Sequence, residues 1–214
     1  LAKPKTYPAF IDRFLASAEA YRIPARLVFN KIDIYQEEEN LMLKEYQSIY
    51  EKIGYPCYTI SATQGINLES LKKDMTGKIN VISGHSGTGK STLINRFIPG
   101  LDLKIADISE YHKTGKHTTT FTEMFEMPGG GYIIDTPGIK GFGVVDMDKE
   151  EIFHFFPEIF EKSKDCKFYN CTHIHEPGCA VLKAVENNEI SPSRYLTYLD
   201  MMQDEDDKYR TPGY

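Results

Sequence analysis

Hydrophobic residues recur at helical spacing near the start of the chain and then give way to a short apolar run. In FIDRFLASAEAYR, Phe10, Phe14 and Leu15 share one helical face, which predicts a helix beginning at Phe10. Pro24 ends that pattern, and the apolar residues of RLVFN follow directly. The pattern therefore predicts a helix followed by a short strand.

The same alternation occurs twice more before the middle of the chain. A helix is predicted over 37–53, where Gly54 closes it, and the β-rich run YTIS follows. A third helix over 67–75 precedes the strand KINVIS. Helices that alternate with short apolar strands are typical of a mostly parallel sheet covered by helices on both faces. We therefore expect an α/β fold for this part of the chain.

The C-terminal part shows helical patterns. The segment EEIFHFFPEIF predicts one helix over 150–160, and CAVLKAVENN predicts a second over 179–188. A last helix is expected to begin with Ser191 as its N-cap and Pro192 at its first position. The aromatic residues expected in the core from the first of these helices are Phe153, Phe156 and Phe160.

The composition is that of an ordinary folded protein. The 214 residues are 41% hydrophobic and 26% charged, which allows one sizeable core and a small appendage. We expect an α/β domain over 1–147 and a small helical domain over 148–214. No run approaches the roughly 18 apolar residues of a membrane-spanning helix, and no signal-like segment opens the chain. The expected protein is soluble and cytoplasmic, and it does not bind membranes.

The charge balance limits how the chain can contact nucleic acid. Lys and Arg number 25 against 31 Asp and Glu, which gives a formal net charge of -6. This balance argues against coating nucleic acid by net charge alone, so any RNA contact must be local. Lys162, Lys164 and Lys167 cluster beside a cysteine-rich segment. They either contact RNA phosphates or form a solvated face.

The strongest motif follows the predicted strand KINVIS. The segment GHSGTGKS at 84–91 matches the P-loop pattern of Gly, four residues, Gly, Lys and Ser or Thr. A predicted helix leaves it, so backbone N–H groups would surround a phosphate at a helix N-terminus. Lys90 would bind the β and γ phosphates, and the Ser91 hydroxyl would bind magnesium. The residues expected around the nucleotide are Gly84, His85, Ser86, Gly87, Thr88, Gly89, Lys90, Ser91 and Thr92.

A second phosphate-side motif ends the apolar strand in GYIIDTPG. Asp135 stands at the end of that strand, where a carboxylate can reach magnesium through water. Gly138 can offer its backbone N–H to the γ phosphate. Asp135 by itself would be an ordinary turn residue, but together with the P-loop it predicts a magnesium-assisted phosphate site.

Two motifs at other strand ends are suited to reading a guanine base. Asn30, Lys31 and Asp33 in NKID follow RLVFN, and the Asp33 carboxylate can accept the ring N–H and the amino N–H of guanine. Adenine lacks that pair of donors, so such an acceptor discriminates strongly. Ser61 and Ala62 end the next strand, where a backbone N–H can meet the guanine carbonyl oxygen. Motifs at successive strand ends predict one ligand crevice.

The cysteine-rich segment DCKFYNCTHIHEPGC has the spacing of a metal site. Cys166, Cys171, His173 and Cys179 are separated by four, one and five residues. Three thiolates and one imidazole make a closed tetrahedral zinc site, which is structural because no position is open. His175 is an alternative to His173, and buried cysteines without metal are an alternative to the site as a whole.

Together these motifs resemble a known family. NKID, SA, GHSGTGKS, HTTT and DTPG form the signature set of GTPases, but the guanine-reading motifs precede the P-loop, as in circularly permuted GTPases. The spacing of the cysteine-rich segment is similar to that of permuted small ribosomal subunit biogenesis GTPases of the RsgA type. In that family the zinc ligands correspond to Cys166, Cys171, His173 and Cys179. Members usually carry an N-terminal OB-fold domain, to which nothing in this sequence corresponds.

The resemblance also implies an activity and its partners. It implies hydrolysis of GTP with Mg²⁺, slow for the protein alone and stimulated by the small ribosomal subunit, in late maturation of that subunit. The implied partners are GTP or GDP and the subunit with its 16S rRNA. We expect a structural Zn²⁺ as well, and a monomer.

The sequence points to an unusual group for orienting the attacking water. Ile139 stands where Ras-like GTPases have a glutamine, and an apolar side chain cannot orient water. The catalytic histidine proposed for the family corresponds to His117. The alternative is that His117 is an ordinary solvent-exposed loop residue. One threonine of 118–120, favoured as Thr119, is expected to bind magnesium, within a segment that would respond to the γ phosphate.

Two functions of different class therefore remain open. Lys90, Ser91 and Asp135 favour a GTP-hydrolysing ribosome assembly factor. Ile139 is compatible with the alternative, a nucleotide-gated RNA- or protein-binding module with negligible turnover. NKID disfavours an ATP-using P-loop enzyme.

Overall fold

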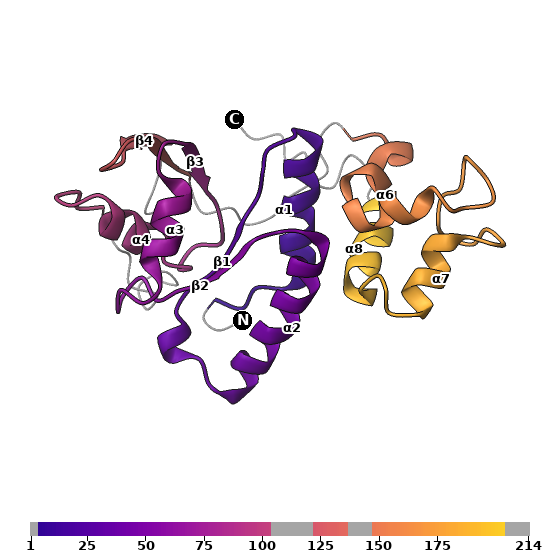
Figure 1. Ribbon diagram of the computed structural model, residues 1–214, viewed down its shortest axis with the longest axis horizontal. Helices are drawn as coiled ribbons and strands as arrows, with labels where there is room; N and C mark the ends of the chain where they lie inside the picture. Colours follow the sequence, from indigo (N-terminus) through magenta and orange to yellow (C-terminus); the bar gives the residue numbers. More distant parts are fainter. Residues whose placement is uncertain (1–3, 104–121, 137–146, 204–214) are drawn as a thin grey trace, which may run out of the picture. The chain divides into compact units, whose positions relative to one another are not determined.

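The computed structural model describes residues 4–103, 122–136 and 147–203, which form two compact units (Figure 1). The first unit comprises Leu1–Thr6, Arg26–Gln47 and Pro56–Lys140, and the second comprises Tyr7–Ala25, Ser48–Tyr55 and Gly141–Tyr214. The predicted linear division into 1–147 and 148–214 stays a prediction.

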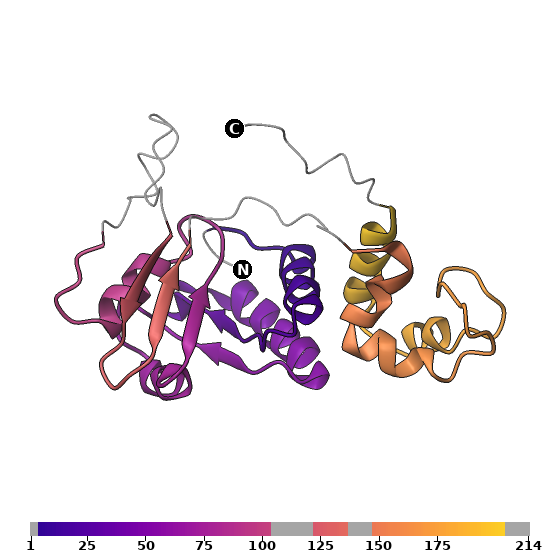
Figure 2. The same cartoon turned by 90° about the horizontal axis from the view of Figure 1, so that it is seen from above.

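The first unit contains short strands that are mainly parallel (Figure 2). Strand β1 (Leu27–Phe29) pairs in parallel with β2 (Cys57–Thr59). Strand β3 (Ile79–Ile82) pairs in parallel with β5 (Tyr132–Asp135), and β4 (Glu123–Glu126) pairs antiparallel with β5. The predicted α/β fold is confirmed. Strand β4 was not predicted, because its two apolar residues are adjacent and flanked by glutamates, so its four residues show no alternation of apolar and polar positions.

Helices α3 (Leu68–Met75) and α4 (Lys90–Phe97) supply much of the first unit's core. The 3-10 helix η1 (Ile32–Ile34) follows β1, and α2 (Glu37–Ile53) follows η1. Apolar side chains from α3, α4 and β5 form one buried cluster, which includes Leu71, Met75, Leu93, Ile94, Phe97 and Ile133. This cluster fixes the P-loop between β3 and α4.

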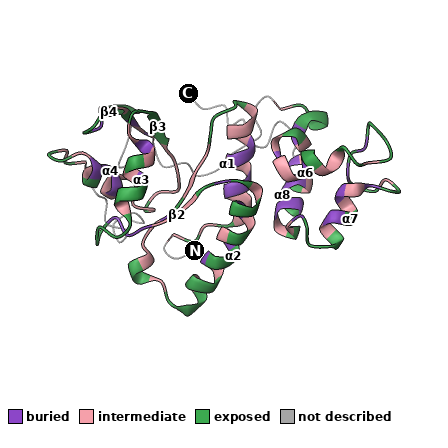
Figure 3. Ribbon diagram, viewed as in Figure 1, coloured by how far each residue is buried: buried purple, intermediate pink, exposed green. Residues whose placement is uncertain are grey.

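The second unit is helical. It contains α1 (Pro8–Ala20), η2 (Lys149–Phe155), α6 (Pro157–Ser163), α7 (Ala180–Glu186) and α8 (Pro192–Gln203). Buried positions run along α1 and α8 (Figure 3). None of the helices described is both long and apolar enough to cross a bilayer.

The prediction of a single helix over 150–160 is wrong. The segment forms a 3-10 helix up to Phe155, and Pro157 starts the separate helix α6. Proline has no backbone N–H for the hydrogen bond that would continue the helix, and it favours the first helical turn. As a result Phe156 is fully buried, whereas Phe160 is 40% exposed and contributes less to the core than expected.

A buried ionic network joins three helices of the second unit. Arg194 of α8 donates to Asp12 of α1 at 3.0 Å and to Glu158 of α6 at 2.7 Å. The hydroxyls of Tyr50 and Thr197 also donate to Asp12. Burial raises the pKa of Asp12, and the adjacent Arg194 opposes that shift. The network explains why α1 packs against α8, far from it in the sequence.

Candidate functional site

The P-loop connects β3 to α4 through glycines in left-handed conformations. Gly87 has φ +80° and Gly89 has φ +92°, values that favour glycine. A Cβ on Gly89 would lie 2.4 Å from Nδ2 of Asn30, so no larger residue fits there without a shift. The loop glycines therefore provide both the turn and the close approach of a neighbouring strand end.

The lysine of the P-loop lies over the loop backbone. Lys90 Nζ donates to the carbonyl oxygens of Gly84 at 2.8 Å and His85 at 3.1 Å. Burial lowers the pKa of Lys90, and the Asp135 carboxylate opposes that shift. Asp135 is 2% exposed, and its neighbour Thr136 donates through Oγ1 to the Ile82 carbonyl at 3.0 Å. The cation and the strand-end carboxylate are thus brought to one edge of the sheet.

One amide side chain connects three loops of the predicted site. Asn30 donates through Nδ2 to the Thr88 carbonyl at 2.9 Å, and its Oδ1 accepts from the Ala62 N–H at 3.0 Å. Lys31 has φ +70°, and its Nζ donates to the Gly87 carbonyl at 2.6 Å. The segments that follow β1 and β2, which were predicted separately, are therefore hydrogen-bonded to the P-loop through Asn30 and Lys31.

The remaining base-side residues lie in two short segments. Ser61 is buried, and its Oγ accepts from the Gln64 N–H at 3.0 Å, which folds the loop back on itself. Asp33 lies in η1 and is exposed to solvent. The structure thus places the Asp33 carboxylate outside the core.

Several predicted residues fall outside the described parts of the chain. These are His117, Thr119 with its neighbours in 118–120, Gly138 and Ile139.

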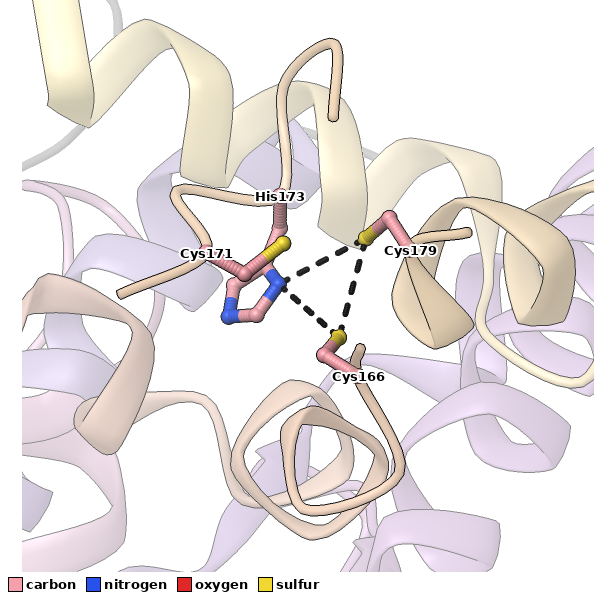
Figure 4. A group of neighbouring side chains, drawn as sticks. All are labelled: Cys166, Cys171, His173 and Cys179. Atoms are coloured by element: carbon pink, nitrogen blue, oxygen red, sulfur yellow. Dashed lines mark hydrogen bonds between the residues drawn. The ribbon is translucent and has the colours of Figure 1, made fainter. Parts of the chain in front are cut away.

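The four predicted zinc ligands come together (Figure 4). Their ligand atoms all lie within 4.8 Å of one another in the group Cys166, Cys171, His173 and Cys179. Nδ1 of His173 lies 3.6 Å from Sγ of Cys166 and 3.6 Å from Sγ of Cys179. His175 lies outside this group, so the structure favours His173 between the two histidines.

The donor chemistry of this Cys3His cluster fits a zinc ion. Burial raises the pKa of Cys171 to about 12 and lowers the pKa of His173. Burial therefore penalises the ligand charges, and a bound dication would offset that cost for the thiolates. Nδ1 is the ring nitrogen of His173 that is directed at the sulfurs. The other ring nitrogen, Nε2, is buried without a hydrogen-bond partner.

Side chains that the sequence analysis missed hold the loop of the cluster. Glu176 accepts hydrogen bonds from the backbone N–H groups of Thr172, Ile174 and His175. Burial alone would raise the pKa of Glu176, but hydrogen bonds from the Thr172 hydroxyl and from backbone N–H groups lower it. The Tyr195 hydroxyl of α8 donates to the His173 carbonyl at 2.7 Å. The sequence signal for Glu176 was only its position three residues after His173.

The order of elements and the two sites define the class of the protein. Strands that carry the guanine-side motifs precede the P-loop, and a Cys3His cluster follows, as expected of a circularly permuted P-loop GTPase with a zinc-type centre. Residues 1–145 match the family described as RsgA GTPase, and the chain belongs to that family. Membership implies magnesium with the nucleotide, and the Cys3His cluster suggests zinc.

Relatives and solved structures agree with this assignment. The chain is 60% identical over 208 residues to "Small ribosomal subunit biogenesis GTPase RsgA 2" of Bacteroides thetaiotaomicron, covering 97% of this chain and 67% of the relative. It is similar to the crystal structure of YjeQ from Thermotoga maritima, with TM-score 0.79, 38% identity, and coverage of 93% and 66%. It is also similar to YloQ, a circularly permuted GTPase, with TM-score 0.75, 30% identity, and coverage of 100% and 67%. The chain spans about two thirds of the length of these proteins.

Proposed function

We propose that this chain binds and hydrolyses GTP during maturation of the small ribosomal subunit. The observation that carries the proposal is the Asn30 side chain, which joins the guanine-side strand end to the P-loop and to the Ser61–Ala62 loop. The relatives' name, small ribosomal subunit biogenesis GTPase, supports the biological role. Small subunits with their 16S rRNA and GTP or GDP are the proposed partners of a monomeric, cytoplasmic protein.

On the phosphate side, backbone N–H groups of the P-loop bind the phosphate oxygens at the start of α4. Lys90 moves its ammonium from loop carbonyls onto the β and γ phosphates, where its charge offsets theirs. The Ser91 hydroxyl would hold Mg²⁺, and the Asp135 carboxylate would do so through water. Magnesium, when bound, neutralises charge on the phosphates.

On the base side, the exposed Asp33 carboxylate accepts the two N–H groups of guanine. Asn30 keeps the base-side segments in register with the P-loop, since its amide bonds both. The Ala62 N–H donates to Asn30, so a backbone N–H of the loop that follows Ser61 and Ala62 meets the guanine carbonyl oxygen. Adenine offers an amino group there instead, so it loses these bonds.

The water-orienting role is assigned to His117, and γ-phosphate contacts are assigned to Thr119, through magnesium, and to Gly138. These assignments rest on the sequence motifs and the family, because the residues lie outside the described part of the chain. The zinc ligands proposed are Cys166, Cys171, His173 and Cys179, supported by their convergence within 4.8 Å. Zinc in this closed set is structural.

Single-turnover hydrolysis of GTP and of ATP, with and without small ribosomal subunits, tests the proposal. GTP-selective turnover that subunits stimulate is the expected result, and equal use of ATP would contradict it. Replacing Lys90 by Ala should weaken GTP binding by about 100-fold, because bonds from a cation to phosphate are lost. His117→Ala should preserve binding and abolish stimulation. Tight GTP binding without stimulated turnover would favour the nucleotide-gated binding module.

A further inference from the structure

A cationic side chain near the end of α4 reaches the loop that precedes α3. Arg96 donates through Nε to the Ala62 carbonyl oxygen at 2.9 Å, and its second guanidinium nitrogen donates to the Thr63 carbonyl oxygen. Arg96 therefore binds two consecutive carbonyls of one loop. No motif identified Arg96, because its partners lie 33 and 34 residues away in the sequence.

The bound loop is fixed from two sides. Asn30 accepts the Ala62 N–H at 3.0 Å, and Arg96 binds the carbonyl of the same residue. Residues 63–66 beyond it are exposed, so packing contributes little to their order. The two side chains, one from the end of β1 and one from α4, thus set the orientation of the peptide groups that follow Ser61.

Bonding at a carbonyl also changes the other end of the peptide group. In a trans peptide the N–H points opposite to the C=O, so Arg96 directs the Thr63 N–H away from α4. A charge-assisted bond to the carbonyl polarises the peptide and strengthens its N–H as a donor. The Ala62 N–H donates to Asn30 and the Gln64 N–H donates to the Ser61 hydroxyl, so the Thr63 N–H is the loop donor that can meet the guanine carbonyl oxygen.

We propose that Arg96 is a positioning residue for base recognition: by holding the Ala62 and Thr63 carbonyls, it presents the Thr63 N–H to the 6-carbonyl oxygen of a guanine nucleotide. The proposal rests on the proposed function of the same site. Because α4 begins at Lys90, Arg96 also links the helix that carries the phosphate-binding lysine to the loop that reads the base. Arg96 acts through the loop and does not itself touch the nucleotide.

Equilibrium binding of GDP, IDP, ADP and inorganic tripolyphosphate separates this role from general support of the fold. IDP keeps the 6-carbonyl and lacks only the 2-amino group, ADP lacks the 6-carbonyl, and tripolyphosphate reports the P-loop alone. In Arg96→Met the Kd for GDP should rise by about fivefold, the loss expected for partly solvated charge-assisted bonds. The Kd for IDP should rise by the same factor, while ADP and tripolyphosphate should stay within about twofold.

Two control variants complete the experiment. Lys73→Met removes one exposed positive charge from α3 and should leave all four affinities unchanged. Arg96→Lys keeps the charge but cannot bind two carbonyls through one planar group, so it should recover only part of the GDP affinity.

An unchanged Kd for GDP in Arg96→Met would overturn the proposal, as would a parallel loss of tripolyphosphate binding. A parent protein that binds ADP as tightly as GDP would instead overturn the proposed function itself.

Discussion

The two functional regions of the molecule are built in different ways. The Cys3His cluster takes its four donors from Cys166 to Cys179, and three of them are buried. The proposed nucleotide site gathers loops that range along the chain from Asn30 to Asp135, joined by side chains that bond to backbone groups. The cluster therefore belongs to the core of the second unit. The loops of the proposed nucleotide site are partly exposed, so their positions depend on the hydrogen bonds between them.

This difference predicts opposite responses to substitution. Removing a donor of the Cys3His cluster should remove both a ligand and part of the core, because Cys171 and Cys179 belong to the buried apolar cluster of the second unit. Removing a hydrogen bond between nucleotide loops should change affinity while the apolar cluster of α3, α4 and β5 remains.

The largest effect is expected for Cys179→Ser. Structural zinc contributes on the order of 10 kcal/mol to folding of small zinc domains, so the variant should lose zinc and most of the order in the second unit. Metal analysis by mass spectrometry and hydrogen exchange of peptides from 150–203 measure both. Cys57→Ser is the matched control, since Cys57 lies in β2 outside the cluster and should keep full zinc content. A zinc-loaded Cys179→Ser protein with unchanged exchange would contradict the contrast.

The next effect concerns a buried charge in the same unit. Arg194→Met leaves the carboxylates of Asp12 and Glu158 without their buried cation, which should cost about 3–5 kcal/mol of unfolding free energy. Lys164→Met, which removes an exposed pair with Glu161, should cost less than about 1 kcal/mol. Urea unfolding of the zinc-loaded proteins measures both values. Similar losses in the two variants would show that burial of the Arg194 network contributes nothing beyond a surface pair.

Much of this architecture could be predicted from the sequence. The features that could not be predicted depend on contacts between distant residues or on backbone geometry. The P-loop and the Cys3His spacing are local patterns whose chemistry requires those residue types, so their positions were readable. The pairing of Asp12 with Arg194 joins residues 182 apart, and no local pattern specifies it. The choice between His173 and His175 depended on backbone geometry, since His173 adopts φ +60° and turns its ring toward the sulfurs. Arg96 resembled any exposed helical arginine.

A smaller loss of stability is expected from substitutions in the turn between β4 and β5. A Cβ on Gly131 would lie 2.5 Å from the Lys78 carbonyl oxygen, whereas a Cβ on Gly130 would meet nothing within 4 Å. Both glycines have positive φ, +91° and +96°, so Ala carries about 1 kcal/mol of backbone strain at either position. Gly131→Ala should therefore cost about 3 kcal/mol and Gly130→Ala about 1 kcal/mol in thermal or urea unfolding. Equal losses of unfolding free energy in the two variants would mean that the turn can move away from Lys78 at little cost.

The smallest effect contrasts two aspartates, one in each unit. Hydrogen bonds from Arg26 and Lys78 lower the pKa of Asp74 to about 2, whereas burial raises the pKa of Asp12. A lowered folded-state pKa stabilises the protein above the unfolded value near 3.8, and that stabilisation is lost as pH falls toward 2. The raised pKa of Asp12 acts in the opposite direction, favouring the folded state at low pH.

The Asp74 ion pairs are therefore tested by comparing Asp74→Asn with the parent protein from pH 6 to pH 3. Solvent screening limits the expected advantage of the parent to about 1 kcal/mol at pH 6, and this advantage should shrink below about pH 4. Taking the difference between two proteins at each pH cancels acid effects on the Cys3His cluster, which both share. A difference that stays constant down to pH 3 would show that the Asp74 carboxylate has no lowered pKa, and that its hydrogen bonds stabilise the first unit independently of charge.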